Sequence, residues 1–272
     1  MSKQPLSAFW DSSRAYYEQA AATNPEASPD RQVLFSHLSA GDRVLDLGSG
    51  SCENSLWVPA GCRYVGLDVS TTALVMAREA KRPAAGVRGD GETLPFGDAT
   101  FDAVMSTWAL EHFHDPGGTF LEVARILKPG GLLLLVGSTW DLPYEMPPSL
   151  PPSRRLEVSL RRLARQFLSF VTGRHGFDMV REPRVLTEGY VPDADAVHVA
   201  QSWQVGTFLQ AIGLDLVDQR GLPHRPDPAG ARGLLRRLLR AFPPWRRGWG
   251  NTLVVARRGP RVKPVAYRLR WL

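Results

Sequence analysis

The 272-residue chain is long enough to bury a large α/β core, and its 43% hydrophobic and 22% charged residues are ordinary for a globular protein. Its two cysteines are too few for a disulfide framework or a zinc site, and we expect inert thiols in a reducing cytoplasm. The sequence predicts neither a signal peptide nor a membrane-spanning helix, because no apolar run is long enough.

The net charge of +6 is unevenly distributed along the chain. From Arg220 onward there are fourteen Lys and Arg residues and one acid, Asp227, whereas residues 1–219 carry nineteen basic and twenty-six acidic side chains. This asymmetry favours an anionic surface or partner for the C-terminal part alone.

The first predicted helix covers 9–22, and its aromatic residues Tyr16 and Tyr17 share a face with Phe9 at helical spacing. Further helices are predicted over 31–38, 53–59, 71–81, 117–127, 154–171 and 201–212. Strands are predicted over 43–47, 63–67, 101–106, 132–136, 214–218 and 252–256, with another ending at Gly89.

The most informative stretch is RVLDLGSGSC (43–52), where a short apolar strand stops at Gly48-Ser49-Gly50. Glycine allows a positive φ and lets a ligand approach the main chain closely. The third glycine position of a dinucleotide fingerprint is Cys52 in this chain. The next strand ends in Asp68, about 20 residues on, where an acid binds the ribose hydroxyls of a nucleoside cofactor.

Four blocks, in order, resemble the class I S-adenosylmethionine-dependent methyltransferases, within them the ubiquinone-biosynthesis-like (methyltransferase type 11) branch. They are VLDLGSGS (44–51), YVGLDVS (64–70), GDGETLPFGDATFDAV (89–104) and FLEVARILKPGG (120–131). The resemblance covers roughly residues 35–137. It implies an α/β fold with a Rossmann-like, seven-stranded, mostly parallel sheet, helices on both faces and a helical insertion. It also implies S-adenosyl-L-methionine as the cofactor, and no metal.

The resemblance implies that Asp68 binds the ribose, that Asp90 lies beside the adenine, and that Tyr16 or Tyr17 lies near the methionine end. The full implied set of cofactor-binding residues is Tyr16, Asp46, Gly48, Ser49, Gly50, Asp68, Val69, Asp90, Gly91 and Leu110. Structural alternatives stay open: Asp46 as a capping side chain, Asp90 as a turn former, and the tyrosines as packing on the sheet edge.

His112 follows the fourth strand, at the sheet edge where ligands bind in this fold class. A histidine there could take a proton from a hydroxyl acceptor, so His112 is the candidate catalytic residue. Leu-Glu-His is, however, a family block found with many substrates, and a role in orienting the loop ranks above that of general base.

Three parts of the chain are expected. Residues 1–137 and 201–258 form the S-adenosylmethionine-binding domain, 138–200 an insertion that caps the acceptor, and 259–272 a basic C-terminal tail. The helix predicted over 154–171 is amphipathic and basic, and the default expectation is a surface helix packed on its own domain.

Residues 229–250 alternate leucines with arginines and end near Trp245 and Trp249. Arginine with interfacial tryptophan suits an anionic membrane surface, so we expect this segment to dock a cytoplasmic protein on a membrane. Arginine with aromatic residues also suits single-stranded nucleic acid, which ranks lower, and a solvated helix remains an alternative.

The sequence therefore predicts methyl transfer to a small-molecule acceptor that is hydrophobic or linked to a lipid or glycan. The alternatives are an RNA methyltransferase and a non-catalytic nucleoside-binding module with the same fold. An NAD oxidoreductase is disfavoured, because the adenine-side and Leu-Glu-His blocks have no place in one.

Overall fold

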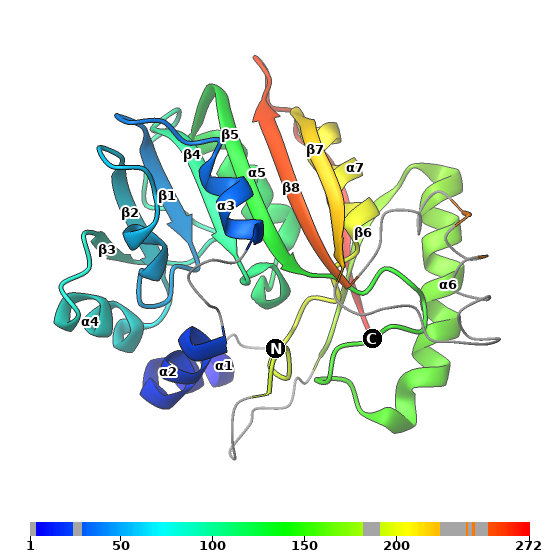
Figure 1. The fold of residues 1–272 in the computed structure, drawn as a ribbon. Coiled ribbons are helices and arrows are strands. Elements are labelled where there is room, and N and C mark those ends of the chain that lie inside the picture. The colour runs from blue at the N-terminus through cyan, green and yellow to red at the C-terminus, as the bar shows by residue number, and fades with distance from the viewer. Residues whose placement is uncertain (1–3, 24–28, 182–190, 224–237, 239–240, 243–249) are drawn as a thin grey trace.

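A computed structural model of the chain describes residues 4–23, 29–181, 191–223, 238, 241–242 and 250–272. Within those residues a seven-stranded sheet carries helices on both faces, and a second, two-stranded sheet lies beside it (Figure 1). The predicted fold class, a Rossmann-like and mostly parallel seven-stranded sheet, is confirmed.

The large sheet has the strand order β3-β2-β1-β4-β5-β8-β7. Its strands are β1 (Arg43–Leu47), β2 (Arg63–Asp68), β3 (Ala85–Arg88), β4 (Phe101–Thr107), β5 (Leu127–Ser138), β7 (Leu214–Pro223) and β8 (Gly250–Arg258). β8 runs antiparallel to both neighbours, β5 and β7, and the remaining pairs are parallel. The order reverses between β1 and β4, which is where a ligand site is expected in such a sheet.

The described helices are α1 (Gln4–Ser12), α2 (Arg14–Thr23), α3 (Pro29–Phe35), α4 (Thr71–Glu79), α5 (Pro116–Ile126), α6 (Arg155–Thr172) and α7 (Ser202–Ile212). Short 3₁₀ turns occur at η1 (Glu53–Leu56), η2 (Leu110–His112) and η3 (Pro152–Arg154). Side-chain caps fix the first turns of two helices. The Ser70 hydroxyl accepts a hydrogen bond from the Ala73 amide at 3.1 Å at the start of α4, and Asp115 accepts one from the Gly118 amide at 3.0 Å at the start of α5.

The single helix predicted over 9–22 is in fact two helices, α1 and α2, separated at Ser13. The hydroxyl oxygen of Ser13 accepts a hydrogen bond from the Tyr16 amide at 3.3 Å. Serine favours such local bonds over a helix interior, so Ser13 ends one helix and starts the next. The periodicity of aromatic residues across the break is what hid it.

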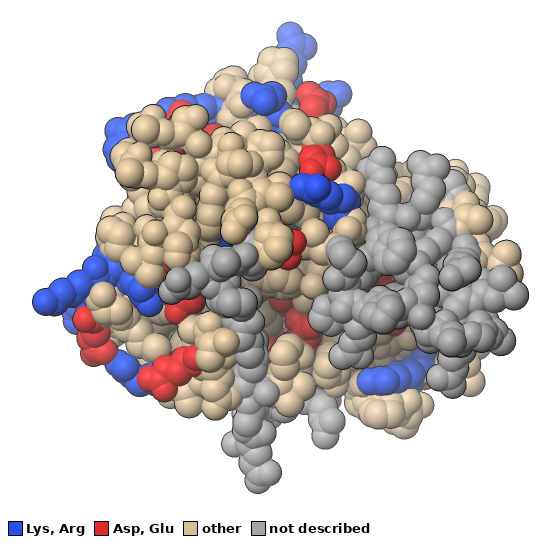
Figure 2. Space-filling model, viewed as in Figure 1, with Lys and Arg blue, Asp and Glu red and all other residues tan. Residues whose placement is uncertain are grey.

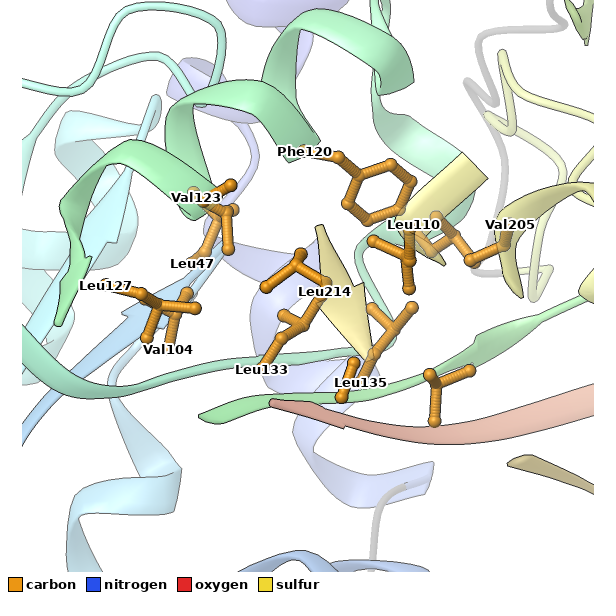
Figure 3. Close-up of a cluster of buried hydrophobic side chains, with 14 of the residues drawn as sticks. Leu47, Val104, Leu110, Phe120, Val123, Leu127, Leu133, Leu135, Val205 and Leu214 are labelled. Atoms are coloured by element: carbon orange, nitrogen blue, oxygen red, sulfur yellow. The ribbon is translucent and has the colours of Figure 1, made fainter. Parts of the chain in front are cut away.

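The core lies on both faces of the large sheet. On one face, Leu47, Val104 and Leu133 belong to one buried cluster with Phe120 and Val123 of α5, and Val205 of α7 joins it (Figure 3). On the other face, residues of β1, β4, β5 and β8 pack against α3. The strands are buried on both faces, as their continuous apolar runs indicate.

The insertion contributes α6 and a strand, β6 (His175–Met179), that the sequence did not reveal. β6 pairs in parallel with β9 (Tyr267–Trp271), so residues 259–272, predicted as a tail, contain a strand. Asp178 of β6 lies 3.0 Å from the Arg270 Nε of β9 and 3.5 Å from the Arg162 Nε of α6. This buried charge cluster joins the C-terminus of the chain to the insertion.

Most of the segment 229–250, predicted to dock on a membrane, lies outside the described residues. Among the described helices, none has the length and apolar content needed to cross a membrane.

Candidate functional site

A cavity of about 1060 Å³ lies at the carboxyl edge of the parallel strands, where β1 and β4 diverge. The loops after β1, β2 and β4 form one side of it, and α1, α2 and the insertion form the other. Figure 2 shows acidic side chains in the recessed centre of this face of the molecule. The cavity is therefore at the position that the strand order predicts for a ligand.

The glycine turn after β1 forms one wall of the cavity. Gly48 and Gly50 have φ angles of +73° and +51°, which side chains disfavour. A Cβ atom on Gly48 would also lie 2.6 Å from that of Ala109. The Gly48 and Ser49 amides donate to the Leu67 carbonyl at 2.9 and 3.1 Å, which fixes the turn against β2.

Cys52 occupies the third glycine position with φ 56°, in the left-handed region. The Cys52 thiol is buried against Gly66 of β2. It fits there because Gly66 has no side chain: a Cβ atom on Gly66 would lie 2.4 Å from the Cys52 sulfur. Burial raises the pKa of the Cys52 thiol to about 11, so it is protonated and unreactive at neutral pH. The thiol packs inside the turn, and its raised pKa agrees with the inert thiol that the sequence predicts.

Asp68 ends β2 at the cavity wall, as predicted. One carboxylate oxygen accepts from the Gly50 amide at 2.8 Å, and the other accepts from the Ser70 amide at 2.9 Å. Burial raises the pKa of Asp68, and these backbone hydrogen bonds oppose that rise. Each oxygen keeps acceptor capacity that it can turn toward a sugar hydroxyl.

Asp46 is fully buried behind the wall and does not line the cavity. It accepts a hydrogen bond from the Tyr64 hydroxyl and another from the Asn54 amide nitrogen at 3.0 Å. Burial raises the pKa of Asp46 to about 6, against the effect of those two bonds. Asn54 does line the cavity, so Asp46 can influence a ligand by holding Asn54 in place.

Val69, Asp90 and Gly91 line the cavity beside Asp68, on the side predicted for adenine. The Asp90 carboxylate accepts from the Glu92 amide at 3.0 Å, so it also shapes its own turn. Leu110 is placed differently from the expectation: its side chain is fully buried in the hydrophobic core and is absent from the lining (Figure 3). Its neighbours Ala109 and Glu111 reach the cavity instead.

The N-terminal helices cover the cavity with Trp10, Tyr16 and Tyr17. The two tyrosine rings meet edge to face at 5.2 Å, and Tyr17 packs against the glycine turn. The Trp10 carbonyl accepts from the Ser70 hydroxyl at 2.9 Å, while its indole N–H donates to Asp195 at 2.9 Å. Trp10 therefore joins the cofactor side of the cavity to the insertion.

An acidic cluster surrounds His112, composed of Glu111, Asp193 and Asp195. His112 Nδ1 lies 3.8 Å from an Asp195 oxygen. Burial lowers the pKa of His112, but the three carboxyl groups outweigh it and the net direction is upward. Burial raises the pKa values of Glu111 and Asp193, whose side chains also hydrogen-bond to each other. A bond between two carboxyl groups requires a proton on one of them.

The far end of the cavity is formed by 138–148 and 191–193. It is largely apolar and aromatic, with Trp140, Tyr144 and Met146 in its wall. Among the described residues, those lining the cavity include seven with carboxyl side chains, Glu53, Asp68, Asp90, Glu92, Glu111, Glu145 and Asp193, and two arginines, Arg31 and Arg155. Such a site favours a cationic ligand over a phosphate-bearing one. Among the described residues, no group is arranged to hold a metal ion.

The chain has the fold of the class I S-adenosylmethionine-dependent methyltransferases, with a glycine turn and an acid at the end of β2 at the positions expected in that class. Residues 45–135 match the family described as methyltransferase domain. A demethylmenaquinone methyltransferase of Corynebacterium efficiens is 38% identical over 97 residues, covering 35% of this chain and 41% of that protein. The chain thus spans less than half the length of the curated relatives it matches.

Two solved structures extend the likeness beyond the matched residues. A methyltransferase of Mesorhizobium loti, described as S-adenosylmethionine dependent, has 20% identity and a TM-score of 0.53, covering 86% of this chain and 99% of that one. The 1,6-didemethyltoxoflavin-N1-methyltransferase of Burkholderia thailandensis, solved with S-adenosylhomocysteine and 1,6-didemethyltoxoflavin, has 17% identity and a TM-score of 0.54, covering 93% and 88%. At these identities both show the fold alone.

The sequence did not identify Asn54, Asp193 or Asp195, nor the carboxyl group of Glu111, as parts of the site. Glu111 lies inside the Leu-Glu-His block, directly before His112, the candidate catalytic residue. Asp193 and Asp195 lie in the insertion, and only the fold brings them to His112. A cluster of Asp residues at 193 and 195 is visible in the sequence, but nothing local distinguishes it from a solvated loop.

Gly66→Ala tests whether Gly66 makes room for the Cys52 thiol. We expect a loss of stability of about 1–3 kcal/mol from overpacking, because the new methyl group would meet the sulfur. Cys52→Gly should restore part of that loss in the double variant, since it removes the thiol and suits the positive φ, whereas the contact with the Ser49 hydroxyl at 2.8 Å stays. Urea unfolding of the four proteins gives the coupling energy. Additive losses would contradict this packing.

Proposed function

We propose that the chain transfers a methyl group from S-adenosylmethionine to a small, largely apolar acceptor. The observation that carries the proposal is one continuous cavity, which runs from the glycine turn and Asp68 to the aromatic chamber at Trp140 and Tyr144. Its volume of about 1060 Å³ is at the top of the range of about 300–1,000 Å³ for one drug-sized ligand. That supports cofactor and acceptor lying side by side.

The residues on the cofactor side fit S-adenosylmethionine. The glycine turn lines the cavity beside Asp68, and Asp68 has acceptor capacity left for ribose hydroxyls. When bound there, the cofactor supplies a methyl group on a positively charged sulfur. The excess of carboxyl groups over arginines around the cavity favours that cation. Asp68, Asp90 and the turn amides would hold the nucleoside, and Tyr16 and Tyr17 would cover it.

The carboxyl groups around His112 favour different roles for Glu111 and His112 in the transfer step. Burial lowers the pKa of His112, but the three acids raise it by more, and this net rise makes the ring less available as a proton acceptor. Burial raises the pKa of Glu111 to about 8, so its carboxylate form, which can accept a proton, prevails only above that pH. A general base is most effective when its pKa lies close to the working pH. In this arrangement Glu111 receives a proton from the acceptor, and His112 stabilises the resulting charge.

The apolar character of the chamber supports a hydrophobic acceptor. Trp140, Tyr144 and Met146 offer aromatic and thioether surface, with carboxyl groups available for a few directed hydrogen bonds. The matched Corynebacterium proteins are named for a demethylmenaquinone acceptor, which is a lipid-like small molecule. We extend to this chain only that chemical class.

RNA methylation is the second candidate, and the cavity argues against it. A polyanionic substrate would meet a lining with seven carboxyl groups and two arginines. Favourable RNA sites instead present positive charge and stacking surfaces to the strand. A non-catalytic nucleoside-binding module would have the same cofactor-binding residues as an enzyme. A turnover experiment distinguishes the two.

Asp68→Ala tests the cofactor assignment. Losing charge-assisted hydrogen bonds to the ribose, each worth about 1.5–3 kcal/mol, should weaken S-adenosylmethionine binding at least tenfold by calorimetry. Because Asp68 also bonds the Gly50 and Ser70 amides, the melting temperature of the variant must be measured too. Asp98→Ala, which removes an exposed carboxylate paired with Arg125, is the matched control. Unchanged binding in the Asp68 variant, or tight NAD binding by the parent, would refute the assignment.

The transfer itself is tested with methyl-labelled cofactor and two extracts of host cells, one of lipids and small molecules and one of RNA. We expect label in an apolar small molecule, identified by mass spectrometry. Label in the RNA fraction would establish the second candidate. Cofactor binding with no labelled product in either extract would favour the non-catalytic module.

A matched pair of substitutions separates the roles of the two neighbouring residues. Glu111→Gln should lower turnover by about 10²–10⁴-fold, as expected when a general base is removed. His112→Asn should cost less than that, with some loss of stability, because the raised pKa of the histidine disfavours it as the proton acceptor. Cofactor affinity should be nearly constant in both variants. A collapse of turnover in the His112 variant alone would reverse the two roles.

A further inference from the structure

Helix α6 buries a largely polar face and exposes apolar side chains, the reverse of an ordinary surface helix. The residues it buries against the protein are Val158, Arg162, Gln166 and Ser169, three of which are polar. The residues it exposes are Leu156, Leu160, Leu163, Phe167, Leu168, Phe170 and Val171, each between 39% and 75% exposed. The helix does pack on its own domain, as expected from the sequence, but it does so through a largely polar face.

Buried hydrogen bonds hold the helix in this orientation. The Arg162 guanidinium has no exposed side-chain surface and donates to the carbonyls of Leu142 at 3.3 Å and Pro143 at 3.5 Å. It also donates to the carbonyls of Trp140 and Glu145, and Gln166 donates to the Asp141 carbonyl at 3.3 Å. Rolling the helix to hide its leucines would break these bonds, so the apolar face stays outward.

The exposed apolar residues form one stripe. At 3.6 residues per turn, Leu156, Leu160, Leu163, Phe167, Phe170 and Val171 fall within an arc of about 100°. Phe242 covers part of its C-terminal half, stacking on Phe167 at 6.3 Å and meeting Phe170 at 5.0 Å between ring centroids. Leu156 and Leu160, at the other end, are 75% and 61% exposed. An apolar stripe of this kind marks an interaction site.

The charges beside the stripe identify what it meets. Exposed Arg154, Arg155, Arg161 and Arg174 flank the helix, against one exposed acid, Glu157, which pairs with Arg161 at 2.7 Å. An occupant must therefore offer an apolar interior and a negatively charged boundary. An anionic lipid bilayer has both, and a helix of this type lies in the plane of its interface.

We propose that α6 docks the chain on an anionic membrane surface, with its leucine and phenylalanine stripe in the headgroup boundary and its arginines at the phosphates. α6 lies at the side of the molecule opposite β3 and α4, so docking leaves those elements free (Figure 1). Docking does not depend on methyl transfer. One consequence does rest on the proposed function: Arg155, the first residue of α6, also lines the cavity, so an acceptor dissolved in lipid would enter from the docked side.

Vesicle sedimentation of the full chain tests the proposal, with phosphatidylglycerol–phosphatidylcholine vesicles compared with pure phosphatidylcholine. We expect binding to the anionic vesicles only, weakening as salt is raised. Leu156→Glu with Leu160→Glu should lower the partition coefficient at least tenfold. Val217→Glu, which places the same charge on a residue 50% exposed in β7, should leave it unchanged. Equal recovery with both vesicle types would overturn the proposal.

A second arm tests the charges. Arg154→Glu with Arg161→Glu should weaken binding by more than the roughly fivefold expected for each arginine lost near an anionic surface, because each change also adds a negative charge. Arg78→Glu on α4 is the control, since that exposed arginine lies away from α6. Calorimetry with S-adenosylmethionine should give the same affinity in all these variants, which separates a failure of docking from a failure of the cofactor site.

Three outcomes would reject α6 as the docking surface. The first is no vesicle binding by the parent, combined with a dimer on gel filtration that the Leu156/Leu160 variant dissociates. The second is preferential capture of single-stranded RNA over anionic vesicles. The third is vesicle binding that survives the Leu156/Leu160 variant but is abolished when Arg236, Arg237 and Arg240 become Glu.

Discussion

The glycine turn after β1 depends on one carboxylate, that of Asp68 at the end of β2. One of its oxygens holds the Gly50 amide and the other holds the Ser70 amide, so it fixes the turn and the start of α4 together. The Leu67 carbonyl, one residue earlier, holds the Gly48 and Ser49 amides. The end of β2 therefore shapes the wall against which any ligand in the cavity must lie, and it does so with a group that also faces that ligand.

The sequence predicted the sheet and the residues that line the cavity around the glycine turn and Asp68, because those features follow from short-range patterns. Asp68 and the Gly48–Gly50 turn are adjacent in the fold since parallel strands bring their carboxyl ends to one edge. Asn54, Asp193 and Asp195 were missed because their role depends on distant partners. Asp195 reaches His112 and Trp10 only after the insertion has folded back over the sheet.

Helix α6 shows a different limit of sequence reasoning. Its 4-3-4-3 spacing reveals which residues share a face, but periodicity cannot say which face points inward. The usual assumption, that the apolar face is buried, fails here because Arg162 finds backbone carbonyls and Asp178 inside the protein. A buried charge with that many partners is costly to remove from its site. β9 adds Arg270 to the same aspartate, and that pairing comes from the far end of the chain.

Trp10 connects the two halves of the cavity. Its carbonyl is bonded to Ser70, beside the proposed ribose site, and its indole is bonded to Asp195, the acid nearest His112. Its ring also meets that of His112 edge to face at 5.5 Å. A displacement of Trp10 would break both of these hydrogen bonds. The wall beside Asp68 and the acids around His112 are therefore held together through a single residue of α1, by its main-chain carbonyl on one side and its indole on the other.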